Sequence, residues 1–212
     1  MIISNKHQFV FVAIPKTATH AIRFALRKHL DEKMDWEQAT LFVNNKKLPF
    51  ESLAKLGTGH ITCLEIHPFL GEETWRKYFK FTIVRNPYDR FISFCFFMNR
   101  EDITFKKNAR ERMKRILKNK KVHRNLWFIP QHHFITDNNG ELMVDFVGKY
   151  ENLVNAHQHI CNKMGIPSEQ LPRINRSIHN NYTEYYDDEL RQAVFEFYHQ
   201  DFELLGYEED IF

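Results

Sequence analysis

The chain has 212 residues, of which 43% are hydrophobic and 27% are charged, with a mean hydropathy of −0.52. This composition excludes wholesale disorder, collagen and coiled coil, and it is typical of a single folded domain over residues 1–212. The net charge of +3 is too small to indicate a nucleic-acid partner, so none is expected.

We expect neither a membrane anchor nor a disulfide framework. The longest apolar runs, residues 9–15 and 91–98, fall far short of the ~20 residues that cross a bilayer. Only one lysine precedes the first run and no small-residue cleavage site follows it, so no signal peptide is expected. The three cysteines (Cys63, Cys95 and Cys161) are widely spaced, as in proteins with reduced thiols. These features predict a cytoplasmic protein.

A strand, a tight loop and a helix are predicted first along the chain. Residues 8–14 (QFVFVAI) favour a buried strand, which Pro15 ends. Apolar residues then recur at helical spacing from Ala18 to His29. After a turn, residues 60–66 predict a short strand-like segment.

The same succession begins again at residue 79. Residues 79–84 predict a second apolar strand, Asn86 is a good helix N-cap, and Pro87 suits the first helical position. The helix is expected to end near Met98. Two strand–loop–helix units predict an α/β fold, with a central parallel β-sheet flanked by helices.

The second half of the chain is expected to add one strand and several helices. Residues 106–124 contain ten lysines or arginines and one glutamate. They predict either a solvated surface helix or a surface that attracts an anionic acceptor. A strand is expected over residues 142–147, a helix from Asn152 to Gly165, and a last helix over 188–205.

The loop at residues 15–20 has the features of an anion site. The first N–H groups of a helix have no partner within it, and the helix dipole adds partial positive charge. Lys16 adds a full charge, while Thr17 and Thr19 add hydroxyl donors. Such a loop suits phosphate, although a plain turn with a Thr N-cap and a surface lysine fits equally well. Without its glycines, the loop is not a Walker A motif.

A second anion site is indicated where the strand over 79–84 ends. Arg85 follows that strand, and ligands of open α/β sheets bind at the carboxyl ends of strands. Ser93 lies about two turns into the next helix, so both could hold one phosphate. Alternatively, Arg85 pairs with Asp89. Arg90 is expected to be a structural partner.

Together these two motifs resemble the phosphosulfate-binding signatures of sulfotransferases that use 3′-phosphoadenosine 5′-phosphosulfate (PAPS). The motifs are PKTATH at 15–20 and VRNPYDRFIS at 84–93. Residues 59–62, 65–66, 78–81, 147–153 and 185–187 are similar to the carbohydrate branch, which includes heparan and chondroitin sulfotransferases and short bacterial relatives. The resemblance covers most of the chain. It implies the P-loop-like sulfotransferase fold, PAPS as donor, its product PAP, and no metal.

The resemblance also implies roles for individual residues. The 5′-phosphosulfate would be held by Pro15, Lys16, Thr17, Ala18, Thr19 and His20. Arg85 and Ser93 would hold the 3′-phosphate, and Arg176 and Ser177 belong to a loop that closes over the nucleotide in relatives. Ala18 replaces a more common glycine, and His20 replaces the usual serine or threonine.

Sulfuryl transfer mainly needs positioning and electrostatic stabilisation. Lys16 suits the neutralisation of the leaving phosphate. The acceptor hydroxyl needs a base, and imidazole titrates near neutral pH. By resemblance His60 is that base. Taken without the family, His60 is a hydrogen-bonded structural histidine, and Glu65 and His20 are the alternative bases. Glu65 and Glu151 are expected on the side of the acceptor, a hydroxyl-bearing and most simply glycan-like molecule.

Two other functions compete with this interpretation. A P-loop-type small-molecule kinase would explain the first loop, but the second strand ends in Arg-Asn where a magnesium-binding Asp is expected. A non-enzymatic module that binds acidic polysaccharide would leave both anion loops unexplained. The paired histidines His132/His133 and His157/His159 lack a metal-binding spacing and are expected to be structural.

Overall fold

The computed structural model describes residues 1–39, 48–56, 58–171 and 181–210. It contains two compact units, which we describe separately. Unit 1 comprises Met1–Val84 and His133–Ile174, and unit 2 comprises Arg85–His132 and Asn175–Phe212. A single domain over the whole chain stays a prediction.

Unit 1 is built on a five-stranded sheet in the order β3-β1-β2-β4-β5. The strands are β1 (Ile2–Ser4), β2 (Phe9–Val12), β3 (Trp36–Glu37), β4 (Phe79–Val84) and β5 (Phe146–Lys149). The neighbours β2, β4 and β5 are parallel, as predicted, whereas β1 pairs antiparallel with both β2 and β3. The sheet is therefore mixed, and its antiparallel edge was not predicted.

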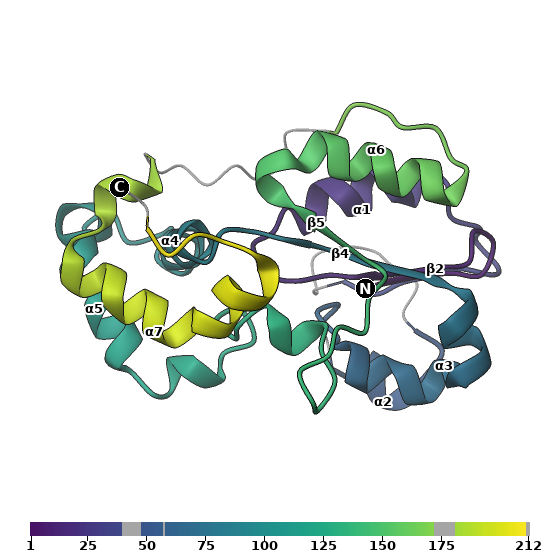
Figure 1. The fold of residues 1–212 in the computed structure, drawn as a ribbon, viewed down its shortest axis with the longest axis horizontal. Helices are drawn as coiled ribbons and strands as arrows, with labels where there is room; N and C mark the ends of the chain where they lie inside the picture. Colours follow the sequence, from purple (N-terminus) through teal and green to yellow (C-terminus); the bar gives the residue numbers. More distant parts are fainter. Residues whose placement is uncertain (40–47, 57, 172–180, 211–212) are drawn as a thin grey trace. The chain divides into compact units, whose positions relative to one another are not determined.

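Helices cover both faces of this sheet. Figure 1 shows α1 (Thr19–Arg27) and α6 (Leu153–Met164) on one face, and α2 (Glu51–Ala54) and α3 (Cys63–Lys77) on the other. Phe11, Phe81 and Phe146 are register partners across the three parallel strands. The side chains of α1 and α6 pack on this row of aromatic residues, and this packing forms the core of unit 1.

Two segments of unit 1 differ from the sequence prediction. Residues 60–66 were expected to be strand-like, but α3 begins at Cys63 because Thr62 and Glu65 form a capping box. The strand expected over 142–147 lies at Phe146–Lys149 instead, and Leu142 makes only an isolated bridge to Thr136.

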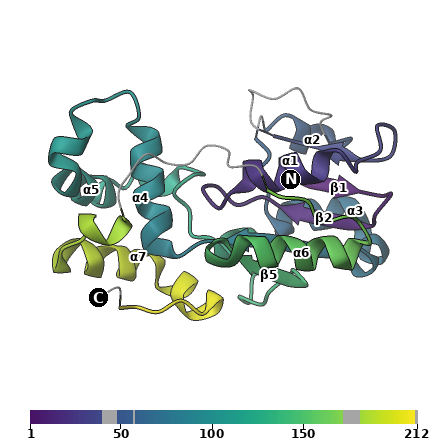
Figure 2. The same ribbon diagram turned by 90° about the horizontal axis from the view of Figure 1, so that it is seen from above.

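Unit 2 is helical. It contains α4 (Pro87–Met98), α5 (Ala109–Lys118) and α7 (Asp188–Leu205), which pack together in Figure 2. Asn86 caps α4 by accepting from the Tyr88 N–H, and Pro87 is its first residue, as predicted. The core of this unit is largely aromatic.

Short 3₁₀ helices complete the two units. They are η1 (Phe105–Asn108), η2 (Val122–Arg124), η3 (His132–Phe134), η4 (Tyr150–Asn152) and η5 (Tyr182–Tyr185).

The basic stretch at 106–124 is in large part a surface helix. Met113 and Leu117 of α5 are buried in the core of unit 2. Lys114 binds the carboxylates of Asp187 and Glu189 at 2.9 and 2.6 Å, which offsets part of the positive charge. Within the described residues, no helix combines the length and hydropathy needed to cross a membrane.

Candidate functional site

The first predicted anion loop connects β2 to α1 and has an unusual backbone. Lys16 and Ala18 both have left-handed conformations, with φ values of 68° and 64°. For a residue with a Cβ atom this conformation costs roughly 1–2 kcal/mol. It explains physically why a glycine suits position 18, where this chain has alanine.

The two threonine hydroxyls of the loop bind the backbone. Thr17 Oγ1 and Thr19 Oγ1 donate to the carbonyl oxygen of Ile14, at 3.0 and 2.7 Å. Both side chains are buried. Their hydroxyl hydrogens therefore shape the loop, whereas the sequence suggested that they point to an anion.

The N-terminus of α1 has no side-chain cap. The N-cap residue is Ala18, and it makes no side-chain hydrogen bond. The alternative interpretation of this loop, a plain turn with a Thr N-cap, is therefore wrong. The first N–H groups of α1 are thus not capped by a side chain, as in helices that bind anions. Half-buried Lys16 and exposed His20 flank this end. The pKa of His20 is lowered by partial burial and by the positive charges of Arg23 and Lys16.

His60 is attached to the start of the same loop. Its Nδ1 lies 2.7 Å from the carbonyl oxygen of Ala13. A carbonyl oxygen only accepts, so Nδ1 carries the hydrogen and Nε2 is unprotonated in the neutral ring. His60 is 8% exposed, and burial, assisted by the nearby N-terminus and by Arg23, lowers the pKa of its ring to about 3.

The backbone before His60 fits tightly against a neighbouring segment. A Cβ atom at Gly59 would lie 1.9 Å from the carbonyl oxygen of Gln38. Only glycine fits this approach. The His60 N–H donates to Thr58 Oγ1 at 3.1 Å. These contacts fix the backbone from which the imidazole projects.

The alternative bases and acceptor-side residues have other surroundings. Glu65 is exposed and accepts from the N–H and the hydroxyl of Thr62, at 2.7 and 2.9 Å. Its carboxylate therefore caps α3. Glu151 lies exposed in η4.

A buried ion cluster lies on α1 and β3, and the sequence analysis missed it. Glu37 accepts from Arg23 Nε at 2.8 Å and from Arg27 Nε at 2.6 Å. The side chains of Arg23 and Glu37 are 6% and 7% exposed. Burial is the main cause of the lowered pKa of both His20 and His60, and the positive charge of Arg23 adds to it in both cases. The sequence signal for this cluster was Arg23, a charged residue on the buried side of α1.

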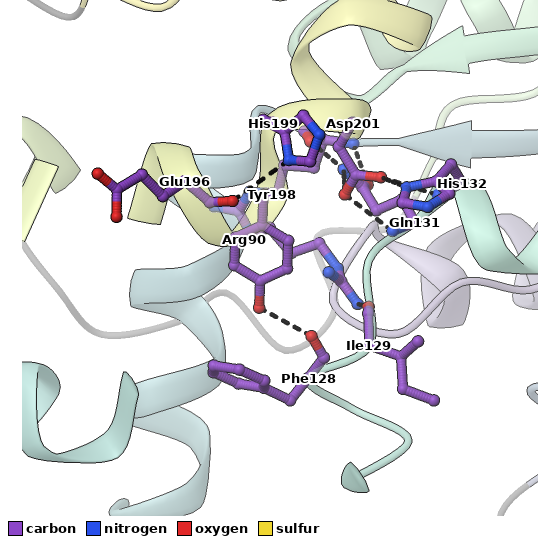
Figure 3. A network of polar contacts seen from close by, with 10 residues as sticks. Arg90, Phe128, Ile129, Gln131, His132, Glu196, Tyr198, His199 and Asp201 are labelled. Carbon is purple, nitrogen blue, oxygen red and sulfur yellow. Dashed lines mark hydrogen bonds and ion pairs between the residues drawn. The ribbon is translucent and has the colours of Figure 1, made fainter. Parts of the chain in front are cut away.

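In unit 2, Arg85 pairs with Asp89, as one of the two interpretations proposed. Its Nε and Nη2 donate to Asp89 Oδ2 at 2.9 and 2.7 Å. The residue is 7% exposed. Ser93 is buried in α4. Arg90 is fully buried and donates to the carbonyl oxygen of Ile129 at 2.8 Å (Figure 3), so its predicted structural role is confirmed.

Gln131, His132 and Asp201 form a buried polar network (Figure 3), and the side chain of Gln131 contacts the backbone of Arg85. Asp201 Oδ1 accepts from the His132 backbone N–H and from its Nδ1, both at 2.8 Å. This pair holds His132 in place, and its structural role stays a prediction. The sequence analysis did not identify Gln131 or Asp201, because the residues that they contact are far away in the chain.

Two further predictions concern the closing segment and metals. Arg176 and Ser177 lie outside the described residues. The Tyr186 hydroxyl donates to the carbonyl oxygen of Tyr88 at 2.9 Å, which places this tyrosine in the packing of unit 2. Among the described residues, no three His, Cys, Asp or Glu side chains form a group that could hold a metal ion.

Comparison with known proteins identifies the family. The model of the sulfotransferase family matches residues 1–208, nearly the whole chain. The chain belongs to the sulfotransferase family. An uncharacterised protein of Archaeoglobus fulgidus is 32% identical to this sulfotransferase over 115 residues, which are 53% of this chain and 89% of that protein. The crystal structure of a sulfotransferase from Alicyclobacillus acidocaldarius shares 16% identity, with a TM-score of 0.43 over 93% of this chain and 95% of that one.

Membership of this family establishes the class of reaction. A sulfotransferase moves a sulfuryl group to an acceptor, so the protein is an enzyme of that class. The kinase and the non-enzymatic module no longer compete with it. The predicted α/β architecture, with a central sheet flanked by helices, is also confirmed.

Proposed function

We propose that this sulfotransferase transfers the sulfuryl group of PAPS to a hydroxyl of a carbohydrate acceptor, with His60 as the base. The observation that most supports this proposal is the hydrogen bond of His60 Nδ1 to Ala13, at the start of the first loop. It fixes the ring in the tautomer whose Nε2 accepts a proton.

The reaction requires one proton transfer and one exchange of S–O bonds. The acceptor oxygen forms a bond to sulfur while the bond from sulfur to the phosphate oxygen breaks, and PAP leaves. The hydroxyl proton moves to His60 Nε2. A pKa of about 3 keeps the ring unprotonated before binding, and the negative charge of a bound donor would raise that pKa towards the range of an effective base.

The first loop is proposed to bind the 5′-phosphosulfate. Lys16 would neutralise the charge that develops on the leaving phosphate. The N–H groups at the start of α1 would bind its oxygens, in the loop shape that Thr17 and Thr19 hold through Ile14. Pro15, Ala18 and His20 complete this proposed loop.

The 3′-phosphate is proposed to bind Arg85 and Ser93. The guanidinium of Arg85 is a planar set of donors suited to phosphate. Arg176 and Ser177 are proposed as further nucleotide contacts. We assign Glu65 and Glu151 to the acceptor side only as proposals.

Calorimetric titration with PAP, and with ATP in parallel, tests the donor. Without metal, we expect micromolar binding of PAP and much weaker binding of ATP. Lys16→Ala and Arg85→Ala should each weaken PAP binding by roughly tenfold or more. Lys55→Ala and Arg100→Ala serve as matched controls, because each removes a basic residue from an exposed ion pair. A metal-dependent preference for ATP would contradict the proposal.

Transfer from [³⁵S]PAPS to a panel of unsulfated oligosaccharides tests the acceptor and the base. His60→Asn retains a side-chain N–H for the Ala13 carbonyl, so PAP binding should persist. Transfer should fall by roughly 10²–10⁴-fold. If His60→Asn transfers at the wild-type rate while His20→Ala or Glu65→Gln does not, the base is one of those residues.

A further inference from the structure

The backbone of Arg85 is held by a side chain from a distant part of the sequence. Val84 ends β4, so Arg85 is the first residue beyond the sheet. Its backbone N–H donates to Gln131 Oε1 at 2.9 Å, and its carbonyl oxygen accepts from Gln131 Nε2 at 2.8 Å. The side-chain amide of Gln131 thus binds both backbone groups of Arg85, as a neighbouring strand would.

Gln131 is itself fixed by Asp201 of α7 (Figure 3). Asp201 Oδ2 accepts from the Gln131 backbone N–H at 2.8 Å, and Gln131 Nε2 lies 3.5 Å from the same oxygen. Both residues are 0% exposed. A buried carboxylate is stable only when several donors surround it. The backbone N–H groups of Gln131 and His132 and the ring of His132 are such donors.

The other end of Arg85 is fixed as well. Asp89 Oδ2 accepts from both Nε and Nη2 of its guanidinium. The arginine is therefore held at the backbone by Gln131 and at the side chain by Asp89. A group that is ordered before its ligand arrives loses less conformational entropy on binding.

We infer that Gln131 is a positioning residue for the binding of the 3′-phosphate: it acts through Arg85 and contacts no substrate itself. This inference rests on the proposed function, because that proposal assigns the 3′-phosphate to Arg85. A purely structural role of Gln131 would affect both ends of the nucleotide equally. A positioning role affects only the 3′ end.

The test compares PAP with AMP, which lacks the 3′-phosphate. Two variants are titrated with both nucleotides: Gln131→Ala, and Gln131→Met, which keeps the side-chain length and removes both the amide oxygen and the amide nitrogen. We expect PAP binding to weaken roughly tenfold, while AMP binding stays unchanged. In the Arg85→Ala background, Gln131→Ala should cause no further loss of PAP binding. Circular dichroism shows which variants fold. Gln192→Ala, an exposed glutamine of α7, is the matched control.

The outcomes separate this inference from the proposed function. If wild type prefers PAP and Arg85→Ala removes that preference, the proposed role of Arg85 stands. Equal losses of PAP and AMP binding in folded Gln131 variants, or no loss of either, then overturn the positioning role alone. If wild type binds PAP no better than AMP, both the role of Arg85 and the inference about Gln131 are wrong.

Discussion

The low pKa of His60 predicts a specific dependence of stability on pH. In the unfolded chain a histidine titrates near 6.5, whereas burial lowers the pKa of His60 in the folded protein to about 3. Between these values the unfolded state binds one more proton, so the free energy of unfolding rises with pH. The contribution of His60 is complete above pH 6.5. It decreases as the pH falls from 6.5 towards 3.

The size of the effect follows from the same two pKa values. Below pH 6.5 the stability falls by about 1.4 kcal/mol per pH unit, since folded His60 stays neutral while the unfolded ring is protonated. From pH 8 to pH 5, His60 alone should therefore reduce the free energy of unfolding by about 2 kcal/mol. His60→Asn removes this titration and keeps a donor for the carbonyl oxygen of Ala13.

Urea unfolding of wild type and His60→Asn at several pH values measures the effect. Contributions of other groups cancel in the difference between the two proteins. That difference should change by about 2 kcal/mol between pH 8 and pH 5, with wild type losing more stability. A difference that stays constant within ~0.5 kcal/mol would refute the reasoning, because His60 would then titrate alike in both states. An NMR titration of the His60 ring gives the same answer independently.

Three further substitutions test the surroundings of the loop, each by urea unfolding. Ala18→Gly should stabilise the protein by up to ~1 kcal/mol, since the left-handed backbone at position 18 strains alanine; a loss of stability would contradict this strain. Gly59→Ala should cost more than ~3 kcal/mol, because its Cβ atom would collide with the Gln38 carbonyl; a loss below ~1 kcal/mol would mean that this segment moves readily. Glu37→Gln should cost ~3 kcal/mol, because Arg23 remains buried opposite a neutral group; an unchanged stability would show that water reaches Arg23.

Features that depend on neighbouring residues in the sequence were predicted well. Asn86 and Pro87 fix the start of α4 through contacts within a few residues. The last helix begins at Asp188 and ends at Leu205, as predicted, between an Asp187 cap and Gly206. Such signals are local, so they can be recognised without the fold.

Features that depend on distant partners were missed. The antiparallel strands β1 and β3 are only three and two residues long and owe their conformation to pairing. Sequence motifs pointed to Lys16 and to Arg85, whose binding roles stay predictions. The supporting residue Gln131 lies 46 positions from Arg85, and Asp201 lies 70 positions from Gln131. No spacing rule connects residues so far apart.

Several locally unfavourable features lie at the two predicted anion loops. The first loop contains two left-handed non-glycine residues, and a buried neutral histidine is attached to it. Beside the start of α4, Arg85, Gln131 and Asp201 are all buried polar groups. Apolar residues would pack at these positions with less desolvation. Strain and buried polarity of this kind cluster where a protein binds ligands, because selection for binding there outweighs selection for stability. These energetic costs support the proposed binding role of the two loops independently of the sequence motifs.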